Sequence, residues 1–310
     1  MRLMKNKKGQ LFTISAILII TIFLLSYIIY NVESDRKSIH NRVDSMNSFV
    51  ISLKEDLRRQ MYITGFRIIF LLEKKIVDTG EPIINLNSSF EEGFYNGTID
   101  SEYQELLYGV TFKNISDSLS DKANRNNLNI SLIPYNLSIS QEDPWHVKMS
   151  LYVNIYVLDK NNLASWNNTE TISSYIDITN FEDPLYIIYA KNKNNGEPYP
   201  NKINKSEYIF SDTSITNLSL EYQNSYYIAS SLGPSFLDRL EGKTSANHNG
   251  IESLVKCEDI MFRDRSAVDY IYFSSESPDS SHHISGMPGC FKLDIAHYNI
   301  YNISGGWIIA

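Results

Sequence analysis

The sequence predicts an α+β protein in which a transmembrane helix continues into a long amphipathic helix, followed by a β-rich extracytoplasmic head. Residues 11–30 form an uncharged apolar run. Residues 32–57 place apolar side chains three, four or seven positions apart, a spacing typical of one helical face. Residues 146–158 alternate apolar and polar side chains, which is typical of a half-buried strand.

The composition excludes several classes of protein. With 43% hydrophobic and 21% charged residues, the chain is neither wholly disordered nor a multi-span membrane protein. Two cysteines are too few for a disulfide scaffold or a zinc ribbon. The formal net charge of −8 argues against a general affinity for nucleic acid.

Residues 10–30 are expected to form one transmembrane helix behind a basic cytoplasmic leader, residues 1–9. About 20 residues at 1.5 Å each cross a hydrocarbon core of about 30 Å. The leader has no acid and four bases, which are Arg2, Lys5, Lys7 and Lys8. Such an excess holds the amino terminus in the cytoplasm, so we expect a single-pass protein of the cell membrane with its carboxyl domain outside. A cleaved secretory signal fits less well, because the apolar run exceeds the usual ~7–15 residues and no small-x-small site follows it.

The junction between leader and span has a specific pattern. Lys7-Lys8-Gly9-Gln10 stands directly before the apolar run and resembles the class III signal peptide of archaeal type IV pilin-like proteins. The resemblance implies that a prepilin-type peptidase cuts between Gly9 and Gln10 and leaves the helix as a membrane anchor or filament core. It also implies further copies of this chain, or other pilin-like subunits, as partners. Bacterial pilins usually have Glu five residues into the mature chain, where this sequence has Ile14. The alternative is a permanent signal anchor that is never cut.

Sequence blocks along most of the chain resemble an uncharacterised archaeal family of membrane-anchored proteins. The blocks are YITGFR at 62–67, DPW at 143–145, LASW at 163–166, FEDPLY at 181–186, GPSFLDRLEG at 233–242, GIESLV at 250–255 and RSAVDYIYF at 265–273. This resemblance implies a membrane-anchored topology and supplies no catalytic residues.

Residues 31–80 are expected to form a stalk that ends in a buried helix. Its apolar stripe consists of Val32, Ile39, Val43, Met46, Val50, Leu53 and Leu57. The stripe either packs on the head of the same chain, which we favour, or pairs with a second copy as in a coiled coil. Residues 61–77 do not form a second span, because the uncharged run is short and contains Arg67. Gly80 and Pro82 are typical helix stop signals.

The segment 81–190 is expected to be a β-rich domain without helical periodicity. Strands are expected at 129–133, 136–140, 146–158 and 171–179, with a shorter apolar run at 185–190. The turn-rich segment 191–205 is the expected linker between domains. Residues 206–310 are expected to be a second β-rich or irregular region, with weaker strands at 208–210, 226–230, 268–273, 291–297 and 307–309.

An exported head is expected to carry covalent modifications. Asn-x-Ser/Thr sequons are more frequent beyond the span than chance predicts, and a sequon accepts a glycan only on an exported surface. They lie at Asn87, Asn96, Asn114, Asn129, Asn136, Asn167, Asn204, Asn217 and Asn302. The alternative is that they reflect Asn-rich composition alone. Cys257 and Cys290, the only cysteines, favour one disulfide over two buried free thiols in an extracytoplasmic domain.

No motif for catalysis or metal binding stands out, since the chain lacks H-E-x-x-H, G-x-S-x-G, a Walker loop and G-x-G-x-x-G. The adjacent His282 and His283 would need Asp279 or His297 to hold a metal ion, and they lie in a loop-like segment. Cys290 with His297 imitates a thiol-protease pair, but a disulfide is the favoured state of Cys290.

A loose acidic group is also present, but it lacks the spacing of an EF-hand calcium loop. It comprises Asp238, Glu241, Asp264 and Asp269. The favoured interpretation is solvated acids with local ion pairs to Arg239 and Arg265. We therefore expect no catalytic residue, no metal and no cofactor.

Tyrosines among Asn and Ser offer adaptable contact surfaces, although a Tyr-rich β surface is the simpler interpretation. Those singled out are Tyr95, Tyr103, Tyr108, Tyr135, Tyr222, Tyr226 and Tyr227. The favoured function is a membrane-anchored, pilin-like surface protein with a structural or interaction role, such as a minor pilin or filament-associated component. The alternative is a single-pass receptor or adhesin whose head binds a glycan or polypeptide. An extracytoplasmic hydrolase is the least favoured.

Overall fold

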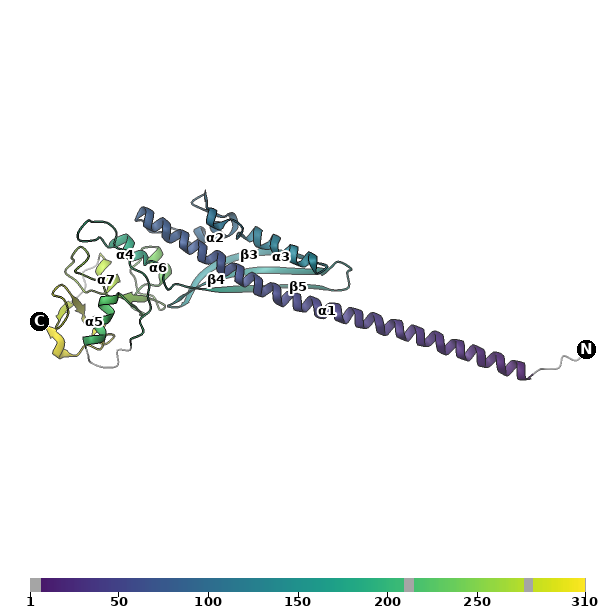
Figure 1. The fold of residues 1–310 in the computed structure, drawn as a ribbon. Coiled ribbons are helices and arrows are strands. Elements are labelled where there is room, and N and C mark those ends of the chain that lie inside the picture. Colours follow the sequence, from purple (N-terminus) through teal and green to yellow (C-terminus); the bar gives the residue numbers. More distant parts are fainter. Residues whose placement is uncertain (1–6, 209–214, 276–280, 310) are drawn as a thin grey trace, which may run out of the picture.

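The computed structural model describes residues 7–208, 215–275 and 281–309. Its dominant element is α1, Lys7–Thr79, a helix of 73 residues. At 1.5 Å per residue this helix is about 110 Å long. Figure 1 shows that the amino-terminal part of α1 projects alone, whereas its other part lies along a sheet. The expected α+β class, with a long amino-terminal helix and small sheets, is confirmed.

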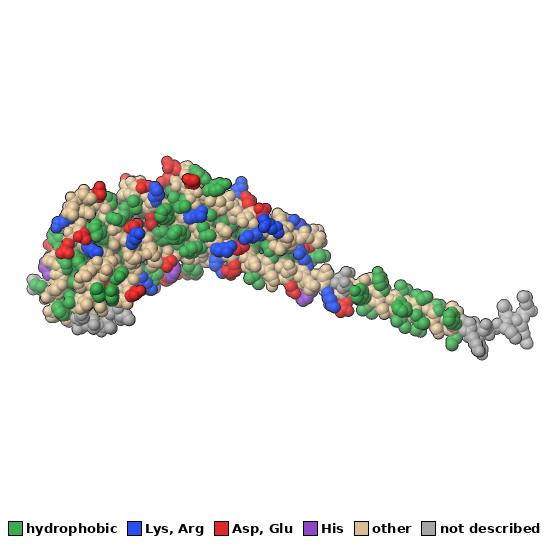
Figure 2. All heavy atoms as spheres, in the orientation of Figure 1, with side chains coloured by type: hydrophobic (Ala, Val, Ile, Leu, Met, Phe, Trp, Pro, Cys, Tyr) green, Lys and Arg blue, Asp and Glu red, His purple; other side chains and the backbone are tan. Residues whose placement is uncertain are grey.

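The projecting part of α1 is apolar on all sides. Apart from half-buried Ala16, every side chain from Leu11 to Tyr30 is exposed. The large apolar side chains among them have exposed fractions between 53% and 77%, and Figure 2 shows them as a green rod outside the head. In the described part of the chain, α1 is the one helix long and apolar enough to cross a membrane.

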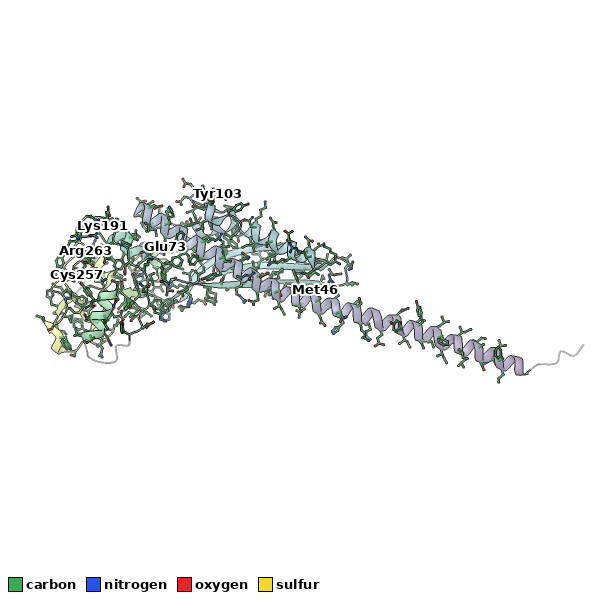
Figure 3. All side chains as sticks on the ribbon, in the orientation of Figure 1. Met46, Glu73, Tyr103, Lys191, Cys257 and Arg263 are labelled. Carbon is green, nitrogen blue, oxygen red and sulfur yellow. A yellow bond between two sulfur atoms is a disulfide. The ribbon has the colours of Figure 1, made fainter. Side chains whose placement is uncertain are left out.

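The rest of α1 packs on the head. Figure 3 labels Met46 and Glu73, which lie near the two ends of the packed part. The last four residues of the predicted stripe are buried here, with exposed fractions of 0–6%: Met46, Val50, Leu53 and Leu57. The first three, Val32, Ile39 and Val43, remain exposed. The stripe therefore packs on its own head only from Met46 onward.

A three-stranded antiparallel sheet covers the packed part of α1. The strands β3 (Leu128–Asp143), β4 (His146–Asp159) and β5 (Ser165–Asp177) lie in the order β3-β4-β5. The alternation predicted for 146–158 is confirmed: the apolar side chains of β4 are fully buried, namely Val147, Met149, Leu151, Val153, Ile155 and Val157. The two strands expected at 129–133 and 136–140 are one strand, β3, with a register shift between Pro134 and Asn136. Proline has no N–H to give to the ladder, which is why it stands at an irregularity.

Gly65 marks the closest approach between α1 and the sheet. A Cβ at this position would stand 2.5 Å from Cδ1 of Ile176 on β5 and 3.0 Å from Sδ of Met149 on β4. A side chain at position 65 would therefore require Ile176, or the helix itself, to shift.

The segment after Pro82 contains helices that the sequence interpretation missed. These are α2 (Leu86–Asn96) and α3 (Phe112–Arg125). Three short elements lie between them: β1 (Thr98–Ile99), β2 (Glu102–Tyr103) and η1 (Glu105–Leu107). The expectation of no helical periodicity in this region is wrong. In α3 the buried residues Ile115, Leu119 and Ala123 are four positions apart, but polar residues surround them and hide the pattern.

The carboxyl-terminal half consists of short elements. They are α4 (Pro184–Tyr189), α5 (Ile215–Asn224), β6 (Tyr227–Ala229), α6 (Phe236–Leu240), β7 (Ile251–Ser253), α7 (Asp269–Phe273), β8 (Ser281–Ile284), β9 (Lys292–Asp294), α8 (Ile295–Tyr298), η2 (Gly305–Trp307) and β10 (Ile308–Ile309). Strands β6 and β7 pair, and β10, β8 and β9 form a small sheet in that order. Figure 1 places these elements at the end of the head farthest from the amino terminus.

Several short strands expected here are absent or different. The segment 268–273 forms helix α7 for all but its first residue, and the run at 185–190 forms helix α4 for all but its last residue. The segment 291–297 contains the three-residue strand β9 and the start of helix α8. Asp294 caps α8, because its side chain accepts a hydrogen bond from the N–H of Ala296. A short apolar run fits a buried helix as well as a buried strand, so periodicity did not separate them. The strand expected at 226–230 is present as β6, and the one at 208–210 extends outside the described residues.

Residues 191–205, the expected linker, bond to segments on both sides. Lys191, labelled in Figure 3, forms a bridge with Pro198 inside the segment. Lys202 forms one with Glu182 on the amino-terminal side, and Asn192 forms one with Ile260 on the carboxyl-terminal side. Lys205 forms a parallel bridge with Tyr227. The segment thus adds backbone bonds between the sheet region and the carboxyl-terminal half.

Candidate functional site

The exposed apolar segment of α1, residues 11–30, is the largest uncovered apolar surface of the described chain. Polar groups within it are satisfied locally: the Thr21 hydroxyl donates to the carbonyl of Ile17 at 2.8 Å. A helix whose every face is apolar fits lipid, or a bundle of similar helices, and does not fit water.

Charges resume immediately beyond this segment. Lys37 lies 3.4 Å from Glu33, and His40 lies 3.5 Å from Asp44, both pairs one turn apart on α1. These pairs are exposed and contribute little stability. Their position sets a polar limit to the apolar segment on the side that faces the head.

Arg42 ties α1 to the head where the helix meets the sheet. Its guanidinium bonds to the carboxylate of Asp159 at the end of β4, and it donates to the carbonyls of Asn126 and Asn127 at 3.0 and 2.9 Å. Burial alone would raise the pKa of Asp159, but the hydrogen bond from Arg42 and the backbone N–H groups of residues 161 and 163 lower it. The contact therefore joins a cation on the helix to a carboxylate that stays ionised.

Two further ion pairs hold the same stretch of α1. Lys54 lies 2.6 Å from Glu170 on β5. Asp56 lies 2.5 Å from Lys122 on α3. With the contacts of Arg42, these pairs fix the direction in which the apolar segment leaves the head.

The predicted processing residues lie at the amino-terminal end of this helix. Because α1 begins at Lys7, the residues Lys8, Gly9 and Gln10 are in its first turn and directly precede the apolar segment. Residues 1–6 of the leader, with Arg2 and Lys5, lie outside the described residues.

Cys257 and Cys290 are joined by a disulfide with a Cα–Cα distance of 6.0 Å. Cys257, labelled in Figure 3, is buried, and its sulfur lies 3.4 Å from the Tyr222 hydroxyl. The bond leaves no thiol at Cys290 for a nucleophile. His297 bonds to carboxylates instead, so the structure does not bring together a thiol–histidine pair.

The histidines do not converge on a metal site. His282 Nδ1 lies 2.9 Å from the Tyr298 hydroxyl, and His283 Nδ1 lies 3.2 Å from the carbonyl of Phe291. Asp279 lies outside the described residues. Among the residues that are described, no three His, Cys, Asp or Glu side chains are grouped so that they could hold a metal ion.

The loose acidic group is dispersed over separate partners. Asp238 caps α6 through a capping box with Ser235. Glu241 pairs with Lys243 at 2.5 Å, and Asp264 pairs with Lys292 at 2.6 Å. Glu241 and Asp264 are thus in local ion pairs, but with lysines. The expected pairing with Arg239 and Arg265 is wrong for these two residues, and Asp238 caps a helix instead.

The fourth member, Asp269, belongs to a buried ionic cluster that sequence reasoning missed. Arg239 Nη1 lies 2.5 Å from Asp183 and 2.9 Å from Asp269, and all three side chains have no exposed surface. The Tyr227 hydroxyl donates to Asp183 at 2.8 Å, and the Ser253 hydroxyl donates to Asp269 at 2.9 Å. Burial raises the pKa of Asp269 to about 6 against the opposing effect of Arg239. No substrate reaches these groups, so the cluster joins α4, α6, β7 and α7 as a structural tie.

A second buried cluster surrounds His297. Its Nδ1 lies 2.7 Å from Asp294, and its Nε2 lies 3.3 Å from Glu252 and 3.0 Å from the Tyr270 hydroxyl. Burial by itself would lower the pKa of His297, but the two carboxylates raise it to about 9. His297 is therefore a buried cation at neutral pH and has no free nitrogen to act as a base.

The sequons all lie at positions with some exposure. Six asparagines are exposed: Asn87, Asn96, Asn129, Asn136, Asn167 and Asn204. Asn114, Asn217 and Asn302 are half-buried. Each of the six exposed sites is open to a modifying enzyme in the folded chain.

The tyrosines singled out in the sequence do not form one surface. Tyr103, Tyr108 and Tyr135 are largely exposed, with fractions of 59–76%. Tyr222 and Tyr227 are buried, so the expectation that they are surface contacts is wrong. Tyr95 packs on Phe94 and Phe112. Tyr226 is half-buried beside Tyr208.

No protein-family model, curated protein or solved structure matches this chain. The function is therefore inferred from its own residues and geometry.

Proposed function

We propose that this chain is a membrane-anchored, pilin-like surface protein with a structural or interaction role. One observation supports this above all: a single unbroken helix has an apolar, fully uncovered segment at 11–30 and a segment packed on a folded head from Met46 onward. The same helix can thus serve as anchor and as scaffold of the head.

The uncovered apolar segment needs an apolar surrounding. Contiguous apolar surface of this extent on a soluble monomer is rare and normally marks a membrane or protein contact. Twenty apolar residues match the thickness of a hydrocarbon core. Lipid therefore covers this segment before assembly, and helices of other subunits cover it afterwards.

The orientation follows from charge. The leader carries four bases and no acid, whereas acids and bases are mixed from Glu33 onward. By the rule that basic flanks stay inside, the leader is cytoplasmic and the head lies outside. Exposed sequons and one disulfide suit an exported head.

Processing would convert the anchor into a subunit for assembly. A cut between Gly9 and Gln10, which the resemblance of Lys7–Gln10 to a class III signal implies, removes four of the 28 bases and none of the 36 acids. The formal net charge then changes from −8 to −12. Without its basic tether the helix can leave the bilayer, and neighbouring helices then cover the surface that lipid covered.

Topology is tested by adding protease to intact cells and probing for the head. Digestion of everything beyond about residue 35 supports the proposal. Protection of the head in intact cells, with digestion only after lysis, contradicts it.

A further inference from the structure

A polar hollow lies on the head, away from the apolar segment of α1. Its volume is about 460 Å³, within the range of small-molecule sites. Three stretches of chain line it: the turn after β5, the segment 204–208, and the residue before β6. The residues used below are Asn180, Asn204, Lys205, Glu207, Tyr208 and Tyr226.

Two aromatic rings form one wall of the hollow. The centroids of Tyr208 and Tyr226 are 5.8 Å apart, with the ring planes tilted by 50°. Both side chains are half-buried, so each ring is held in place and still presents some surface. An aromatic face of this kind packs against the C–H groups on one face of a saturated, hydroxylated ring.

Exposed polar side chains line the rest of the hollow. The amides of Asn180 and Asn204 and the carboxylate of Glu207 have no hydrogen-bond partner among the residues that are described. Each amide offers both donors and acceptors, and Glu207 accepts. The ammonium of Lys205 lies over the Trp145 ring, 5.2 Å from its centroid, and its N–H groups can also donate. Lys205 and Glu207 balance in charge, so the lining favours a neutral ligand rich in hydroxyl groups.

The backbone around the hollow is held by hydrogen bonds. The N–H of Asn180 donates to the carbonyl of Ile203 at 2.9 Å, and the N–H of Tyr227 donates to that of Asn204 at 2.8 Å. The Ser206 N–H donates to the carbonyl of Tyr227 at 2.8 Å. Asn180 has φ +70°, a conformation that Asn tolerates better than most residues. The backbone that carries these side chains is thus fixed before a ligand binds, which lowers the entropic cost of binding.

We propose that this hollow binds a saccharide, with one sugar face on Tyr208 or Tyr226 and hydroxyl groups bonded to Asn180, Asn204 and Glu207. The sugar has two sources of the same chemistry. It is either an external glycan, or the glycan attached to Asn204 itself, since Asn204-Lys205-Ser206 is a sequon with an exposed asparagine. An attached glycan is joined to the Asn204 amide, so its hydroxyl groups bond to Asn180 and Glu207 only. The second source rests on the exported topology proposed above, whereas the first does not.

The first arm of the test uses the full chain in detergent, produced in a host without N-glycosylation. The probe is a panel of neutral and acidic oligosaccharides, and the dissociation constant of each bound sugar is measured. An external ligand predicts that Tyr226→Ala and Asn180→Asp each weaken binding by about tenfold or more, or 1.4 kcal/mol. Tyr103→Ala is the matched control: Tyr103 is 64% exposed on β2 and does not line the hollow, so it leaves binding unchanged.

Asn180→Asp guards against misfolding, because aspartate also tolerates a positive φ and the turn is retained. Melting temperatures of the variants are compared with that of the wild type. Saccharide binding that both variants leave unchanged overturns the proposal.

The second arm uses a host that glycosylates the chain. A docked glycan predicts that an endoglycosidase releases sugar from Asn204 several-fold more slowly than from the exposed control site Asn96, and that Tyr226→Ala removes this difference. The proposal is overturned if the unglycosylated chain binds no sugar of the panel and Asn204 either carries no glycan or releases it as fast as Asn96. Neither arm depends on processing at Gly9, so failure here leaves the pilin-like function untouched.

Discussion

The guanidinium of Arg42 on α1 bonds to Asp159 at the end of β4, although the two residues are 117 positions apart in the sequence. Asp159 is fully buried and Arg42 is about one-fifth exposed. The bond lies just before the helix becomes packed on the sheet. It therefore locks the uncovered segment of α1 to the head.

Replacing Arg42 by Gln is expected to lower the melting temperature of the head. The substitution leaves the buried carboxylate of Asp159 without its cation and removes two bonds to the carbonyls of residues 126 and 127. Arg59→Gln serves as the control, because Arg59 is 63% exposed and pairs only with Asp56 on the same helix. Equal melting temperatures for the two variants would contradict the role given to Arg42.

Glu73 is expected to be protonated in the folded chain. It is 7% exposed, and among the described residues its Oε1 has no hydrogen-bond partner. Burial, with added repulsion from Glu182 and Asp183, raises its pKa from 4.5 to about 9. Glu73→Gln mimics the neutral form and avoids the uptake of a proton on folding. The variant should be more stable than the wild type at pH 7, by up to roughly 3 kcal/mol in urea denaturation.

The gain from Glu73→Gln depends on pH with a defined sign. The unfolded carboxyl ionises near pH 4.5, so the wild type loses stability as pH rises from there to about 9. The difference between variant and wild type should vanish below about pH 4. A variant that is less stable than the wild type at pH 8 would show that the carboxylate is ionised and paired.

His297 is expected to make the carboxyl-terminal half sensitive to alkaline pH. Its pKa rises from 6.5 to about 9 in the folded chain, so its stabilising effect is complete below pH 6.5 and is lost as pH rises to about 9. The full effect is roughly 3 kcal/mol. In a Glu73→Gln background, His297→Gln should abolish the remaining loss of stability across this interval, measured by urea denaturation. An unchanged slope would exclude a charged His297.

The disulfide is expected to close a loop and to stabilise the carboxyl-terminal half. A loop of about 34 residues contributes roughly 3–4 kcal/mol in the chain-entropy account. Cys257→Ala with Cys290→Ala should lower the free energy of unfolding by about this amount. Thiol labelling provides the check on the wild type: the denatured, unreduced chain should stay unlabelled, and labelling before reduction would show free thiols.

The sequence predicted the elements with long patterns and missed most of the short ones, with β6 as an exception. The helix over residues 7–79 and the strand β4 contain many repeats of one period, so their type was clear. Helices α2 and α3 have few apolar residues among many Asn and Ser, and α7 is a five-residue run with almost no exposed face. Short runs of this kind take their structure from the packing around them.

The buried clusters and the hollow depend on contacts between distant segments. Arg239 meets Asp183 and Asp269, which lie 56 and 30 positions away. Nothing in the local sequence distinguishes these acids from solvated ones, whereas a twenty-residue apolar run can be recognised from the sequence alone. Local sequence likewise does not show that Asn180 and Tyr226 line one hollow, because Asn180 follows β5 and Tyr226 precedes β6.

The mass of the amino terminus of the membrane-extracted chain tests the pilin-like account most directly. The account predicts a wild-type chain that starts at Gln10, and a Gly9→Val variant that starts at Met1 while its head remains outside. Gly9 is needed because a peptidase must approach extended backbone closely, and a branched side chain obstructs that approach. Gly305→Val is the control and should be processed normally, because a Cβ at Gly305 meets no atom within 4 Å. If the wild type and the Gly9→Val variant both start at Met1, the segment is a permanent anchor and the pilin-like account is contradicted.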